Sequence, residues 1–102
     1  MTVRVVVLPD AMQQIEEANA WWRSNRPAAP GLLVRELASA FARLERQPEV
    51  GRPLPRPGFP GLRILLLPRT RYHVYYDPGD GELVVRAFWS AVRGRRVRLR
   101  RT

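Results

Sequence analysis

The sequence predicts an α+β domain in which an N-terminal strand and a helical hairpin precede a small antiparallel sheet. Three observations support this prediction: an apolar β-branched run opens the chain, two stretches with helical periodicity follow, and short strand-like segments separated by turns fill residues 62–89. Two amphipathic helices on one face of a small sheet are a common two-layer arrangement. A length of 102 residues suits one compact domain. We therefore expect the order β-α-α-β-β-β within a single domain, residues 1–102.

The first strand is expected at residues 3–8, because this run is mostly β-branched and apolar. Pro9 ends the strand, and Asp10 then offers a side-chain oxygen that can cap a helix. Gln13 follows three residues later, as in a capping box. The first helix is therefore expected at residues 11–25. Its apolar face comprises Ala11, Ile15, Ala18 and Trp22.

A second helix is expected at about residues 29–46, after an interruption at Asn25-Arg26-Pro27. Its apolar stripe comprises Leu33, Leu37, Ala40, Phe41 and Leu44. Because the link between the helices is short, they should form an antiparallel hairpin. Residues 48–60 hold five of the ten prolines and are expected to form an extended surface loop, since proline excludes helix and central strand.

Three short strands are expected after Gly61, because apolar and aromatic segments alternate there with turn sequences. Strands joined by short turns form an antiparallel meander. In the middle strand, His73 and Tyr75 should lie on the face opposite Tyr72 and Val74. The expected strands span residues 62–67, 71–76 and 82–89.

The net charge of +9 is distributed unevenly along the chain. Residues 1–51 hold six Arg and six acidic residues, whereas residues 52–102 hold twelve Arg and three acidic residues. The excess should lie on an uncovered face of the sheet and on a basic C-terminal tail at about residues 93–102. Such a surface attracts nucleic acid or an acidic protein. The alternative is an arginine-rich composition without a specific role.

The composition excludes several kinds of site. The chain has no Cys and a single His, which leaves no thiolate nucleophile and no zinc site. It also contains no glycine-rich phosphate-binding loop, so neither a metal nor a cofactor is expected. The N-terminus does not resemble a signal peptide, and no apolar run is long enough to span a membrane. We therefore expect a cytoplasmic protein.

Four motifs occur in the second half of the chain, and their order is informative. They are Leu44 with Pro48-Glu49-Val50-Gly51, then Gly61-Leu62-Arg63, then Arg71-Tyr72-His73-Val74-Tyr75-Tyr76, and last the apolar strand that runs into Arg93-Gly94. On the expected β-α-α-β-β-β plan, roughly residues 3–96 resemble the RelE/ParE superfamily of toxins. The resemblance implies the toxin of a type II toxin–antitoxin system, of the plasmid-stabilisation type. A co-encoded antitoxin would hold it inactive in a hetero-oligomer.

The resemblance leaves two toxic activities open, because some members cleave mRNA on the ribosome and others inhibit DNA gyrase without being nucleases. RNA cleavage needs a base, cations for the phosphate and an acid. The candidate base is His73, although it can equally be an ordinary half-buried strand histidine. The candidate cations are Arg63, Arg71, Arg86 and Arg93, expected along one side of the sheet. The chain lacks the lysines and late tyrosine of the RelE branch, which favours gyrase inhibition.

Gyrase inhibition would require a complementary surface, for which the resemblance points to the basic tail. The candidate target-binding residues are Arg93, Arg95, Arg96 and Arg98, and the alternative is a solvated arm. Trp21 and Trp22 are candidate antitoxin-binding residues, although they can also pack the helix or stack on bases. A third hypothesis is a basic nucleic-acid-binding domain without toxicity.

Overall fold

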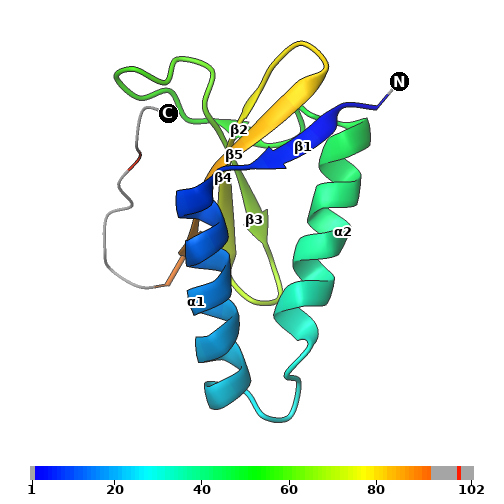
Figure 1. The fold of residues 1–102 in the computed structure, drawn as a ribbon, viewed down its shortest axis with the longest axis vertical. Coiled ribbons are helices and arrows are strands. Elements are labelled where there is room, and N and C mark those ends of the chain that lie inside the picture. The colour runs from blue at the N-terminus through cyan, green and yellow to red at the C-terminus, as the bar shows by residue number, and fades with distance from the viewer. Residues whose placement is uncertain (1, 93–98, 100–102) are drawn as a thin grey trace.

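The predicted order of elements is confirmed in the computed structural model, which describes residues 2–92 and Leu99 (Figure 1). The structure adds one short strand, β2, within the proline-rich segment. The elements among the described residues are β1 (Arg4–Val7), α1 (Pro9–Asn25), α2 (Leu32–Arg46), β2 (Arg52–Pro53), β3 (Arg63–Leu67), β4 (Tyr72–Pro78) and β5 (Glu82–Ser90). None of the helices in this described part is long and apolar enough to cross a membrane.

The sheet has the strand order β1-β5-β4-β3-β2. Strands β3, β4 and β5 form the expected antiparallel meander. β1, in contrast, pairs with β5 in parallel, with Arg4 opposite Glu82, and so extends the antiparallel meander by one strand. The helices explain the difference, because a long helical crossover lets the chain return in the same direction. β2 pairs with β3 at the edge, where proline is tolerated.

Both helices begin at residues other than those expected. α1 begins at Pro9, and its N-cap residue, Leu8, makes no side-chain cap, so the predicted Asp10–Gln13 capping box was wrong. Proline suits the first helical position, and Asp10 lies instead in the first turn, where a carboxylate faces the positive end of the helix dipole. α2 begins at Leu32 because Pro30 disfavours helical backbone at Ala29. The helices run in opposite directions along the sheet (Figure 1).

The main core lies between the two helices and one face of the sheet. Tyr72 and Phe88 stack there at a centroid distance of 4.9 Å, and Phe88 and Tyr76 are fully buried. The helices contribute the apolar stripes predicted from their periodicity. The buried helical residues are Ala11, Ala18, Trp22, Leu33, Leu37, Ala40 and Leu44.

A second, smaller core covers part of the opposite face of the sheet. It comprises the buried residues Phe59, Leu62, Ile64, Tyr75 and Ala87. The proline-rich segment folds back over the sheet through a tight turn, in which Arg56 bridges to Phe59 and Gly58 has a φ of 81°. The expectation that this face is uncovered was therefore wrong, because the loop supplies Phe59 and Leu62 to bury the apolar side of β3.

Candidate functional site

His73 lies near the start of β4, on the face of the sheet opposite the helices. It pairs with Leu66 of β3 and Trp89 of β5, and its ring contacts Tyr75 edge to face at a centroid distance of 6.1 Å. Partial burial lowers the pKa of His73 below its ordinary value of 6.5, and the charges of Arg52 and Arg71 lower it further. The imidazole is consequently neutral at physiological pH and can accept a proton.

Two cations therefore act on His73, and only Arg71 was expected from the sequence. Arg71 precedes β4 in a left-handed conformation, with a φ of 65°, and its carbonyl accepts a hydrogen bond from Ala91. Arg52 reaches the same face because β2 pairs with β3 at Ile64. No sequence pattern indicates this pairing, since β2 has only two residues and lies among prolines.

Arg63 was expected beside these cations but lies on the helix side of the sheet. Its register partner is Tyr76, whose side chain belongs to the main core. The guanidinium donates to the carbonyl oxygens of Glu49, at 3.0 Å, and Gly51, at 2.6 Å. The Tyr76 hydroxyl accepts a hydrogen bond from the Gly51 amide at 2.8 Å. Arg63 therefore holds the segment after α2 against the sheet.

Arg86 lies on the His73 face, but its side chain is engaged by Asp77 and Phe59. It forms an ion pair with Asp77 across the β4–β5 hairpin, and its guanidinium lies 5.0 Å from the centroid of Phe59. Burial of both side chains favours this pairing over solvation. Asp77 was missed, although opposite charges on the two sides of a strong turn indicate a cross-strand pair.

The expected row of arginines along one side of the sheet was therefore wrong for the residues that the structure describes. Arg63 and Arg86 lie on opposite faces, because a bulge at Tyr75/Tyr76 shifts the register of β5 beside Tyr76. Arg71 and His73 remain near each other. Arg93 and the other candidate target-binding residues, Arg95, Arg96 and Arg98, lie outside the described residues.

The two tryptophans proposed to bind a partner occupy different environments. Trp22 is 7% exposed, and its indole N–H donates to the Ala29 carbonyl at 2.9 Å. Trp21 is 36% exposed, and Arg26 lies over both rings, at 5.1 and 5.7 Å from their centroids. Trp22 thus fixes the link between the helices to the core, and Trp21 is the one of the two that offers surface to a partner.

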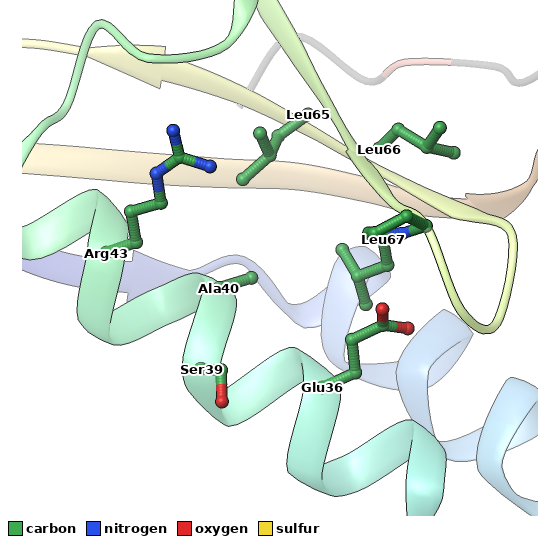
Figure 2. Close-up of a pocket in the computed structure, with 8 residues that line it drawn as sticks. Glu36, Ser39, Ala40, Arg43, Leu65, Leu66 and Leu67 are labelled. Atoms are coloured by element: carbon green, nitrogen blue, oxygen red, sulfur yellow. The ribbon is translucent and has the colours of Figure 1, made fainter.

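A depression of about 230 Å³ lies between α2 and β3 (Figure 2). Glu36 and Arg43 stand at its two ends on the helix, and Leu65, Leu66 and Leu67 line the strand side. The Glu36 carboxylate accepts hydrogen bonds from the amides of Arg69 and Thr70 and from the Thr70 hydroxyl, which ties α2 to the β3–β4 turn. Sequence reasoning did not identify this groove, because it depends on where β3 ends relative to α2.

Comparisons with known proteins agree with this fold. The family model described as the ParE toxin of the type II toxin–antitoxin system parDE matches residues 5–94. The structure is similar to a chain of the chromosomal ParDE toxin–antitoxin system from P. aeruginosa, with a TM-score of 0.72, 15% identity and coverage of 87% of this chain and 96% of that one. It is also similar to a chain of the toxin–antitoxin complex RelBE2 from Mycobacterium tuberculosis, with a TM-score of 0.64, 22% identity and coverage of 88% and 99%. No curated protein sequence matches.

Proposed function

The chain belongs to the ParE toxin family of type II toxin–antitoxin systems, and on this basis we propose that it arrests growth by binding DNA gyrase until a cognate antitoxin neutralises it. The two similar solved structures named above are described as a toxin–antitoxin system and a toxin–antitoxin complex, which supports an antitoxin partner. The basic second half of the chain supports binding to an acidic or nucleic-acid-bound target.

The proposal rests mainly on one observation: two of the candidate catalytic arginines are bonded to other parts of the fold. Arg63 donates to two backbone carbonyls, and Arg86 is paired with Asp77. A cation that stabilises a phosphorane must be free to contact the phosphate oxygens. These two arginines therefore serve as structural residues, which favours a toxin that acts by binding.

A second candidate function, ribosome-dependent cleavage of mRNA, is favoured by one specific observation. His73 is kept neutral beside Arg52 and Arg71, as a general base next to a phosphate would require. Its neighbour Tyr75 is buried, and burial raises the pKa of its hydroxyl, so this phenol stays protonated at neutral pH. The two activities differ in whether they need the His73 imidazole.

Induction of the chain in a bacterial host, with and without the adjacent antitoxin gene, tests the proposal. We expect growth arrest without the antitoxin, accompanied by the DNA damage response and by loss of supercoiling. Rapid loss of translated mRNA would instead indicate the nuclease. The absence of any growth defect would favour the third hypothesis, a basic nucleic-acid-binding domain without toxicity.

Two variants refine this experiment. His73→Ala should leave toxicity intact, because gyrase binding does not need an imidazole; complete loss of toxicity in a folded variant would favour the nuclease. Truncation after Val92 removes six arginines and should weaken toxicity by either route. Full toxicity of the truncated chain would exclude the tail from the mechanism.

A further inference from the structure

Arg71 adopts a backbone conformation that its side chain does not favour. Its φ is 65°, and no other residue except glycine has a positive φ in the part of the chain that the structure describes. Left-handed backbone usually carries glycine or asparagine, because a Cβ atom there crowds the following carbonyl. The Arg71 amide donates to the Leu67 carbonyl at 2.9 Å, and the Arg71 carbonyl accepts from the Ala91 amide at 2.7 Å. An arginine held where glycine would fit better indicates a role for its side chain.

Arg71 and Arg52 bring two positive charges to one place on the sheet face opposite the helices. Besides partial burial, which has the largest effect, the charges of both arginines lower the pKa of His73. The two come from different elements, because Arg52 lies on the edge strand β2 and Arg71 immediately precedes β4. Both are exposed, and neither side chain has an ion pair or a hydrogen bond with another described residue. Unlike Arg63 and Arg86, these cations are therefore available to a partner.

Arg56, in the proline-rich loop, adds a third exposed cation to the same face. Burial raises the pKa of the Tyr75 hydroxyl, and the charge of Arg56 opposes this rise, so Arg56 lies close enough to act on that ring. The charged groups that act on His73 and Tyr75 are all arginines among the residues described. The electrostatic potential over this face is consequently positive.

The side chains between these arginines favour a nucleic acid over an acidic protein as the partner. Tyr75 is buried, and His73 and Trp89 are half-buried, whereas the three arginines are exposed. Protein partners are usually anchored by apolar side chains at the centre of an interface. The backbone of a nucleic acid is instead held by contacts to phosphate oxygens, which the planar guanidinium group matches well.

We infer that Arg52, Arg56 and Arg71 bind the phosphodiester backbone of the DNA that gyrase holds. The toxin then binds the complex of gyrase with DNA more tightly than gyrase alone. This inference rests on the proposed inhibition of gyrase and identifies DNA as part of the target. It also accounts for Arg71, because a residue retained for a phosphate contact can persist in left-handed backbone at some cost in stability.

Three substitutions and one control test this surface. Arg52→Gln and Arg71→Gln each remove one charge, and Arg23→Gln makes the same change at an exposed position on α1. Arg71→Gly removes the charge and also relieves the backbone, so it should melt at or above the wild-type temperature. A lower melting temperature for Arg71→Gly would overturn the inference, because the arginine side chain would then serve the fold.

The first measurement is binding of the purified chain to a short DNA duplex, followed by fluorescence anisotropy at several salt concentrations. Because phosphate contacts release counterions, the logarithm of the binding constant falls with the logarithm of the salt concentration, by about 0.9 for each contact. We expect Arg52→Gln and Arg71→Gln each to make this slope shallower by about 0.9, and Arg23→Gln to leave it unchanged. Wild-type slopes in both variants would overturn the inference.

The second measurement is binding of the chain to purified gyrase, with and without the DNA duplex bound. We expect the wild type to bind the complex with DNA about tenfold or more tightly than gyrase alone, and Arg71→Gln to lose this difference. Equal weakening of Arg71→Gln with and without DNA would overturn the inference in favour of an acidic surface on gyrase. Tighter binding of a single-stranded RNA than of the duplex through the same arginines would overturn DNA as the ligand.

Inhibition of supercoiling separates failure of this inference from failure of the proposed function. Arg52→Gln and Arg71→Gln should inhibit gyrase more weakly than Arg23→Gln. Full inhibition by both variants would overturn the DNA contact and leave the proposed function standing. A wild type that binds DNA through Arg52 and Arg71 but does not inhibit gyrase would overturn the proposed function and, with it, the identification of gyrase-held DNA.

Discussion

Arg86 of β5 forms an ion pair with Asp77 of β4 under the ring of Phe59. The two charged side chains are only 20% and 19% exposed. This relationship joins the β4–β5 hairpin to the proline-rich loop that covers the second face of the sheet. In a nuclease this arginine would bind phosphate. Here Arg86 instead connects β5 with β4 and with the proline-rich loop.

Arg86→Ala should therefore lower the free energy of unfolding by about 2 kcal/mol, because it leaves a partly buried carboxylate without its charged donor. Asp77→Ala should cost a similar amount, and the double variant should cost less than the two single costs added together. Urea unfolding of the four proteins measures this coupling. Additive losses would show that the two side chains act independently.

Tyr76 and Gly51 form a second contact with a measurable consequence. The Tyr76 hydroxyl is the acceptor for the Gly51 amide, and both residues are buried. Tyr76→Phe should lower the free energy of unfolding by about 1–3 kcal/mol, because the amide then lacks a partner. Differential scanning calorimetry checks this value. An unchanged unfolding midpoint would mean that water or another group replaces the hydroxyl.

Gly51→Ala should destabilise the protein for a different reason. A Cβ atom at this position would lie 2.6 Å from the Tyr76 hydroxyl oxygen and 2.9 Å from the carbonyl oxygen of Ile64. Because the second atom belongs to the backbone of β3, adding Tyr76→Phe should not restore stability. Chemical unfolding of the single and double variants measures this, and recovery in the double variant would place the clash at the hydroxyl alone.

The order of elements and the apolar faces of the helices were predictable, because both follow from local periodicity. Leu33, Leu37 and Leu44 occur at helical spacing and are buried as expected. The faces on which Arg63 and Arg86 lie were not predictable in this way. They depend on a β-bulge beside Tyr76 and on a loop that returns to the sheet, which are contacts between distant segments.

His73 gives a prediction about pH. Its pKa in the folded state is lowered below 6.5, so between the two values the unfolded chain binds more protons than the folded one. The contribution of His73 to stability is therefore complete above pH 6.5 and is lost as the pH falls toward the folded-state pKa. His73→Gln should reduce the loss of thermal stability between neutral and mildly acidic pH. Parallel melting-temperature profiles for the two proteins would contradict this prediction.

Glu36 gives a prediction about the β3–β4 turn. Glu36→Ala removes the acceptor for two amides and one hydroxyl and should lower the free energy of unfolding by about 2 kcal/mol. Glu36→Gln keeps one acceptor oxygen and should cost less. Hydrogen exchange of the Thr70 amide provides the local measurement, and we expect faster exchange in Glu36→Ala. Unchanged exchange would mean that contacts other than those of Glu36 stabilise the turn.

The candidate site was predictable in part. His73 and Arg71 could be placed near one another from the sequence, because they are two residues apart at the start of β4. Arg52 could not, because its position depends on a two-residue edge strand. Asp77 could have been identified from the turn that separates it from Arg86. The groove at Arg43 and Leu66 required the relative placement of α2 and β3, which no local pattern encodes.

The most direct measurement is the supercoiling activity of purified DNA gyrase in the presence of the purified chain, with purified antitoxin added in a parallel reaction. We predict that the wild type and His73→Ala inhibit supercoiling equally and that the antitoxin relieves this inhibition. Full gyrase activity in the presence of a folded chain that cleaves mRNA on ribosomes, and does so only with His73 intact, would contradict the proposed function.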